Sequence, residues 1–244
     1  MSDSSSQGNS GFFISLAIVI AALTLGHAIR DMKRTDDTIL VTGSARMRVV
    51  SDYVVWRGNL QASGSNSSVA TQQIQKSRER FIAFLAEKEI PDSLITLHPV
   101  NGWQEQEYDS NGRPTGRTLR YNANQQFEVR SADVDLIVEV ASAVEELMRE
   151  GISLNSQSPD FLYTKLDEAR IALMADATRD AKARAEQIAE AAGGKIGPIR
   201  EARMGVIQVV APNSTNISDY GMYDTSTREK DVVGVVKVSF AVKD

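Results

Sequence analysis

The most regular stretch of the chain is TKLDEARIALMADATRDAKARAEQIAEAAGG, residues Thr164–Gly194. Apolar residues recur in it at steps of three and four, the pattern of one face of a single long α-helix. They are Leu166, Ala169, Leu173, Ala177, Ala181, Ala185, Ile188 and Ala192. Because most of them are alanine, we expect this face to lie close against a β-sheet built from the strand-like stretches on either side.

Both ends of this helix carry recognisable signals. Thr164 followed by Asp167 has the spacing of a capping box. Asp167 and Glu168 lie in the first turn, where the helix dipole favours negative charge. Gly193 and Gly194 are suited to the left-handed residue that commonly ends a helix.

Composition excludes several classes of function. The chain has 244 residues, a net charge of -5 and no cysteine. The absence of cysteine excludes disulfides, thiolate catalysis and cysteine-based metal sites. Apart from a short run near the N-terminus there is no Lys/Arg cluster, so we expect no nucleic-acid partner.

The N-terminal segment resembles a membrane anchor. Residues 1–11 are Ser-rich and polar, which predicts a disordered tail. Residues Phe12–Ile29 contain no Asp, Glu, Lys or Arg, and as a helix they would span roughly 27 Å, just enough for a bilayer core. A cleaved signal peptide is the alternative, with Gly26 and Ala28 before the cut, but residues 1–11 lack its basic start.

The side of the membrane is contested by two arguments. Three basic residues follow the segment at once, and the positive-inside rule would place them and the domain in the cytoplasm. They are Arg30, Lys33 and Arg34. The family resemblance described below favours the opposite, extracytoplasmic side, and we weigh it more heavily because the charge bias rests on so few cations.

Beyond a linker at residues 30–37, the pattern predicts one α+β domain over residues 38–244, with helices packed on a mostly antiparallel sheet. Strands are expected at residues 38–50, 53–62, 93–103, 117–130, 152–163 (with a break near Pro159), 199–211 and 232–242, and further helices at 69–88 and 133–150. The turn signal Asp109-Ser110-Asn111-Gly112 predicts a hairpin with a long tip between two of these strands. The chain would thus combine this domain with one N-terminal transmembrane helix.

The search for catalytic residues finds little. The chain has two histidines, His27 in the apolar segment and His98 in a predicted strand beside Pro99. No metal-ligand spacing surrounds either of them, and no serine lies in a G-x-S-x-G elbow. We therefore expect no catalytic residue, no metal site and no cofactor.

Two other patterns have ordinary structural explanations. Gly193-Gly194-Lys195 lacks the remaining residues of a phosphate loop, and a helix end explains it better. The carboxylate pairs Glu145/Glu146 and Asp167/Glu168 lie on predicted helices, as solvated faces. Residues 212–231 form a long polar loop with Tyr220 and Tyr223, which could cover a partner surface or a pocket or be an ordinary surface loop.

Four segments resemble the bacterial SIMPL-domain family, which includes the periplasmic immunogenic protein of Brucella. Residues 38–56 resemble the family's opening strand pair, in which a Gly is followed by a Pro-Asp or Ser-Asp step, and Ser51-Asp52 occupies that step. Residues 121–135 resemble its Gln-bearing strand and D-V-D helix start. Residues 166–197 resemble its Ala-rich helix with a Gly pair and Ile-Gly. Residues 218–230 resemble the S-D-Y-G…D-T-S…K stretch of a membrane-anchored subgroup.

This resemblance implies helices on an antiparallel sheet, an extracytoplasmic location, ring-like homo-oligomers in some members, and an association with oxidative or envelope stress. No catalytic residues of the family carry over. The expectation is therefore a non-enzymatic, single-pass inner-membrane protein with its domain in the periplasm, which forms a homo-oligomer or binds a partner. The alternatives are a channel-like or transport-accessory ring and an enzyme with a site under the 212–231 loop.

Overall fold

The structure, a computed structural model, describes residues 15–24, 37–214 and 220–243. The chain divides into two compact units. Unit 1 takes the residues up to 46, residues 170–207 and the residues from 233 on, whereas unit 2 takes residues 47–169 and 208–232. The expectation of one domain over residues 38–244 stays a prediction.

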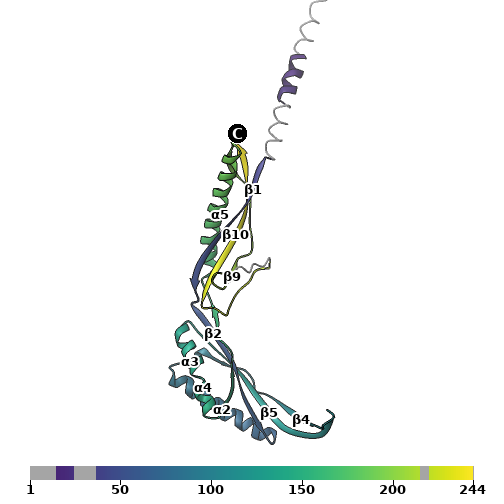
Figure 1. Ribbon diagram of the computed structural model, residues 1–244, viewed down its shortest axis with the longest axis vertical. Helices are drawn as coiled ribbons and strands as arrows, with labels where there is room; N and C mark the ends of the chain where they lie inside the picture. Colours follow the sequence, from purple (N-terminus) through teal and green to yellow (C-terminus); the bar gives the residue numbers. More distant parts are fainter. Residues whose placement is uncertain (1–14, 25–36, 215–219, 244) are drawn as a thin grey trace, which may run out of the picture. The chain divides into compact units, whose positions relative to one another are not determined.

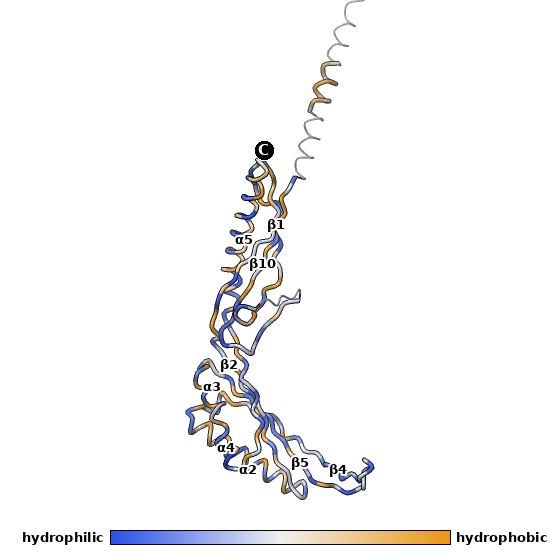
Figure 2. The backbone as a smooth tube through the Cα atoms, in the orientation of Figure 1, coloured by the Kyte–Doolittle hydropathy of each residue, from blue (hydrophilic) through white to orange (hydrophobic). Residues whose placement is uncertain are grey.

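Most of the predicted N-terminal elements lie outside the described residues. This holds for the tail at 1–11, for both ends of the segment at 12–29 and for the linker at 30–37 except its last residue. Residues 15–24 are helical, and Figure 2 colours them largely hydrophobic. Among the helices that the structure describes, none is both long enough and apolar enough to cross a membrane.

Long strands form the sheet of unit 1 (Figure 1). They are β1 (Thr38–Val50), β10 (Glu229–Lys243) and β8 (Lys195–Met204), in that order, and the short β9 (Gln208–Val210), which belongs to unit 2, also pairs with β10. β10 and β8 are antiparallel. The end of β1 and the start of β10 belong to unit 2, so both strands pass from one unit into the other.

The long helix α5 (Leu166–Ala191) packs on this sheet through its alanines, as predicted. Ala177, Ala181 and Ala185 share a core with valines of β1 and β10 and with Phe240. The buried residues of α5 recur at every fourth position, and they are Ala169, Leu173, Ala177, Ala181, Ala185 and Ala189. Each step of four turns about 40° around the helix, so this row winds as the strands of a twisted sheet do. The predicted Ile188 is half exposed, and Ala189 takes the buried position.

The sequence predicts the C-terminal end of α5 correctly and its N-terminal end incorrectly. At the C-terminal end the prediction is confirmed, because Gly193 has a φ of 80° and the Gly194 N–H donates to the Ala189 carbonyl over 2.9 Å. At the N-terminal end the predicted capping box is wrong. The helix begins at Leu166, and the Thr164 hydroxyl instead donates to the carboxylate of Asp52 over 2.8 Å.

The sheet of unit 2 has the strand order β3-β5-β2-β6, with β4 also paired to β5 and β7 also paired to β2. All of these pairs are antiparallel. The strands are β2 (Tyr53–Gly64), β3 (Ile95–Leu97), β4 (Asn101–Tyr108), β5 (Pro114–Ser131), β6 (Ser153–Ser156) and β7 (Asp160–Leu162). The class of helices on antiparallel sheets is therefore confirmed.

Three helices contribute to the core of unit 2, namely α2 (Ser67–Glu87), α3 (Val134–Ala143) and α4 (Glu145–Arg149). Trp56, Phe81 and Phe127 lie at its centre and are fully buried. The rings of Trp56 and Phe127 meet edge to face with centroids 5.0 Å apart, a favourable aromatic geometry.

Three predicted elements are interrupted. The strand expected at 93–103 is divided into a 3-10 turn (Asp92–Leu94), β3 and the start of β4, with Pro99 between the two strands. The helix expected at 133–150 divides at Val144, where the Leu147 N–H bonds back three residues to the Val144 carbonyl. The strand expected at 199–211 divides into β8 and β9, and the Gly205 N–H between them donates to the Val235 carbonyl.

Candidate functional site

The loop from β9 to β10 is the segment for which the sequence leaves a binding role open. Residues 211–214 and 220–228 of it are described. Two backbone hydrogen bonds attach the second half of the loop to β9. The Val209 N–H donates to the Met222 carbonyl and the Asp224 N–H donates to the Val209 carbonyl, both over 2.8 Å. The bridge between Val209 and Tyr223 is parallel, so the returning chain extends the edge of β9.

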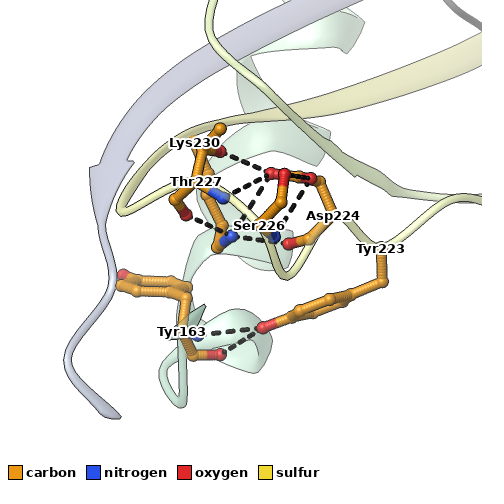
Figure 3. Close-up of polar contacts among 6 residues, drawn as sticks. All are labelled: Tyr163, Tyr223, Asp224, Ser226, Thr227 and Lys230. Atoms are coloured by element: carbon orange, nitrogen blue, oxygen red, sulfur yellow. Dashed lines mark hydrogen bonds and ion pairs between the residues drawn. The ribbon is translucent and has the colours of Figure 1, made fainter. Parts of the chain in front are cut away.

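Asp224 organises the second half of this loop (Figure 3). Its carboxylate accepts hydrogen bonds from the Ser226 hydroxyl over 2.7 Å, from the hydroxyl of Thr227 and from both of their backbone N–H groups over 3.2 Å. Burial alone would raise the pKa of Asp224, but these hydrogen bonds and the charge of Lys230 outweigh it and lower the pKa to about 2. Asp224 is therefore a structural carboxylate that stays ionised.

Lys230 of β10 lies beneath this turn and is fully buried. Its Nζ donates to the carbonyl oxygens of Asp224 over 2.5 Å and of Thr227 over 2.6 Å, and it lies 3.5 Å from the Asp224 carboxylate (Figure 3). Burial lowers the pKa of Lys230, while the negative charge of Asp224 opposes that shift. A buried ammonium is tolerated only when it is paired in this way.

Tyr223 ties the loop to the segment before α5. Its hydroxyl accepts from the Tyr163 N–H over 2.9 Å and lies 3.3 Å from the Tyr163 carbonyl (Figure 3). The neighbouring Thr225 carbonyl accepts from the Phe161 N–H over 2.7 Å. Tyr223 thus has a structural role, whereas Tyr220 is almost fully exposed.

Other contacts hold the same loop to the end of β1. The Asp231 carboxylate, which is 1% exposed, lies 2.6 Å from Nε of Arg48 and accepts from the Asn213 N–H over 3.0 Å. The Ser51 N–H donates to the Arg228 carbonyl, and the Arg228 guanidinium pairs with Asp135. Residues far apart in the sequence therefore meet here, and their shared role is to hold unit 2 together.

The remaining candidates do not converge on one place. His98 is exposed just after β3, and its backbone N–H donates to the Gln126 carbonyl. Glu145 and Glu146 lie in α4, where Glu146 faces Lys88 at 3.6 Å. Across the residues that the structure places, no three His, Asp or Glu side chains gather closely enough to hold a metal ion.

Unit 2 also contains a cavity of about 420 Å³ that no sequence pattern indicated. Ser67, Ala70 and Thr71 of α2 line one side, and residues 100, 102–104 and 121–123 line the other. Within the second side β4 pairs with β5, which sets Gly102 opposite Ala123. None of the ten lining residues is Asp, Glu, Lys, Arg or His, so the cavity is electrically neutral.

The molecule is thus an α+β protein. Ionised side chains hold its loop between β9 and β10, and a cavity with a neutral lining lies between α2 and strands β4 and β5. Residues 39–242 match the model of the SIMPL family, described as a protein of unknown function (DUF541), and the chain belongs to this family. No curated protein matches the sequence. Among solved structures, an uncharacterised conserved protein from Listeria innocua is similar at 12% identity with a TM-score of 0.18, over 78% of this chain and 91% of that one.

Proposed function

We propose that this SIMPL protein is a non-enzymatic, membrane-anchored protein of the cell envelope that acts by self-assembly or by binding a partner. The observation that carries the proposal is that the charged side chains in and beside the loop between β9 and β10 bind other parts of the protein. Asp224, Lys230 and Asp231 are engaged in contacts that hold the described parts of the 208–232 segment. An enzyme with a site under this loop would instead need an acid or base that is available to a substrate.

Support for assembly comes from the family resemblance and from apolar side chains left exposed in unit 1. Leu40 of β1 is 62% exposed, and Ile199 and Met204 of β8 are about half exposed. Exposed apolar residues of this kind suit an interface between copies. The test is the mass of the full chain solubilised in detergent, where a multiple of the 26.7 kDa subunit is expected and a single subunit would contradict self-assembly.

The anchor is proposed from residues Phe12–Ile29, which carry no charged side chain. The intact mass of the native protein tests it. Retention of these residues is expected, whereas a mature chain that starts near Ile29 would mean a cleaved signal peptide and no anchor.

The proposed location of the domain is the periplasmic side of the inner membrane. Ser110 lies at the exposed tip between β4 and β5, and the chain has no cysteine, so Ser110→Cys introduces a single reactive thiol. It should react with a membrane-impermeant maleimide once that reagent reaches the periplasm. Reaction only after lysis of the inner membrane would place the domain in the cytoplasm.

A further inference from the structure

Gly102 of β4 has no evident role in the fold. Its register with Ala123 is regular, its φ lies outside the left-handed region, and a Cβ built on it would meet only the Asn122 carbonyl oxygen, at 3.5 Å. At Gly43, Gly58 and Gly64, by contrast, a Cβ would lie 2.1 to 2.7 Å from the nearest atom. Glycine inside a strand weakens it, and it often marks a place where a ligand approaches closely.

The open space above Gly102 is the neutral cavity. Gly102 and Ala123 share a face of the sheet, and Ala123 is buried in the core that includes Ala70 of α2. Figure 1 shows the β4–β5 ribbon continuing beyond the helices of unit 2. The absent side chain at position 102 therefore keeps this cavity open between α2 and the ribbon.

The lining residues define the chemistry of the ligand. Ser67, Thr71, Gln104 and Tyr121 carry hydroxyl or amide groups that both donate and accept hydrogen bonds. Ala70, Val100 and Ala123 add apolar surface beside them. A charged ligand would find no opposite charge on this lining, whereas a sugar ring offers hydroxyl groups at its rim and C–H groups on its faces.

We propose that this cavity binds a neutral saccharide, with Gly102 as the residue that leaves room for the sugar ring. The volume of about 420 Å³ lies within the range of small-ligand sites, and it admits one or two sugar units. The ligand could be a free sugar or the exposed end of a polysaccharide, because both present the same hydroxyl and C–H pattern. Saccharide binding depends neither on the anchor nor on the number of subunits.

The chain contains its own reporter for the test. It has two tryptophans, of which Trp56 is fully buried in the core and Trp103 lines the cavity with half of its surface exposed. Cellobiose, maltose and diacetylchitobiose, titrated into the full chain in a detergent without a sugar headgroup, should alter Trp103 emission. Calorimetry gives the affinity independently, and a polysaccharide pull-down distinguishes a chain end from a free sugar.

Gly102→Val is the decisive variant, because its Cβ meets only the Asn122 carbonyl oxygen, at 3.5 Å, and its two methyl groups add volume beside the cavity. We expect affinity for the bound sugar to fall at least about tenfold, since one misplaced methyl group has effects of that size. The melting temperature should stay the same or rise, because valine favours strands. Arg117→Val, in the same ribbon but away from the cavity, should bind as the native chain does.

Three results would overturn the proposal. One is that none of the three sugars binds the native chain, and the second is that Gly102→Val binds the sugar as tightly as the native chain. The third is that the native chain binds inorganic phosphate and none of the sugars, and that Gly102→Val weakens the binding of phosphate. This result would make the cavity an anion site at the start of α2. The mass and labelling experiments on assembly and location are unaffected by any of these results.

Discussion

Gly43 of β1 lies so close to Ala177 of α5 that a Cβ built at position 43 would be 2.1 Å from the Ala177 carbonyl oxygen. The same Cβ would be 2.4 Å from the backbone nitrogen of Ala181. Both obstacles are helix backbone, which cannot move aside as a flexible side chain can. The Ser44 N–H next to it donates to the Asp180 carboxylate over 2.8 Å, so α5 is attached to β1 at this point through packing and a hydrogen bond.

Gly43→Ala should therefore destabilise the protein, by about 1–3 kcal/mol, because the added methyl group forces helix and strand apart. Urea unfolding of the native chain and the variant measures the difference. Gly102→Ala is the matched control, since its Cβ meets only one atom, at 3.5 Å, and its stability should be unchanged or slightly higher. Equal stability of Gly43→Ala and the native chain would show that α5 does not lie this close to β1.

The alanine face of α5 predicts a second effect. Ala177 and Ala181 are fully buried against β1 and β10, so Ala177→Leu or Ala181→Leu should overpack the contact and cost about 1–3 kcal/mol. Ala175→Leu, on an exposed side of the same helix, adds the same atoms and should leave the melting temperature nearly unchanged. A similar loss in all three variants would point to an effect on the helix itself.

These contacts show which features the sequence was able to predict. The alternation of β1 gave its bounds, Thr38–Val50, and the spacing in α5 gave its alanine face, because both patterns arise within one element. Ile188 was placed on that face wrongly, since the row repeats strictly every fourth residue along a twisted sheet. The spacing of apolar residues within one helix does not reveal the twist of the sheet on which the helix packs.

Features made by distant residues were not predictable. Thr164 has the spacing of a helix cap, but its partner is Asp52, which lies 112 residues earlier in the chain. The cavity lies between α2 and the paired strands β4 and β5, and no local sequence pattern indicates it. Asp224 and Lys230 stand close in the chain, yet their burial depends on the surrounding fold.

The Asp52–Thr164 contact gives the third prediction. The Asp52 carboxylate accepts from the Thr164 N–H over 2.7 Å and from its hydroxyl over 2.8 Å, which fixes the approach to α5. Asp52→Ala should cost about 1–3 kcal/mol because the two donors lose a charged acceptor. Thr164→Ser keeps both donors and should be close to the native chain in thermal unfolding, and an equal loss in that variant would argue against this role for the hydrogen bonds.

The last prediction concerns acid. The pKa of Asp224 falls from 3.8 to about 2 in the folded protein, so the unfolded chain binds its proton more readily. The ionised carboxylate therefore stabilises the fold above about pH 4, and this contribution is lost as the pH falls through about 2. A shift of this size corresponds to about 2 kcal/mol at neutral pH.

Asp224→Asn isolates this contribution, because asparagine keeps the shape of the side chain and cannot ionise. The native chain should exceed the variant in unfolding free energy most at pH 6, and the excess should shrink by about 2 kcal/mol as the pH falls from 5 to 2. Chemical denaturation at several pH values measures it, and comparing the two proteins cancels the titration of other carboxylates that both share. An excess that stays constant with pH would mean that Asp224 acts through its shape and its neutral hydrogen bonds, and that its charge does not hold the loop above Lys230.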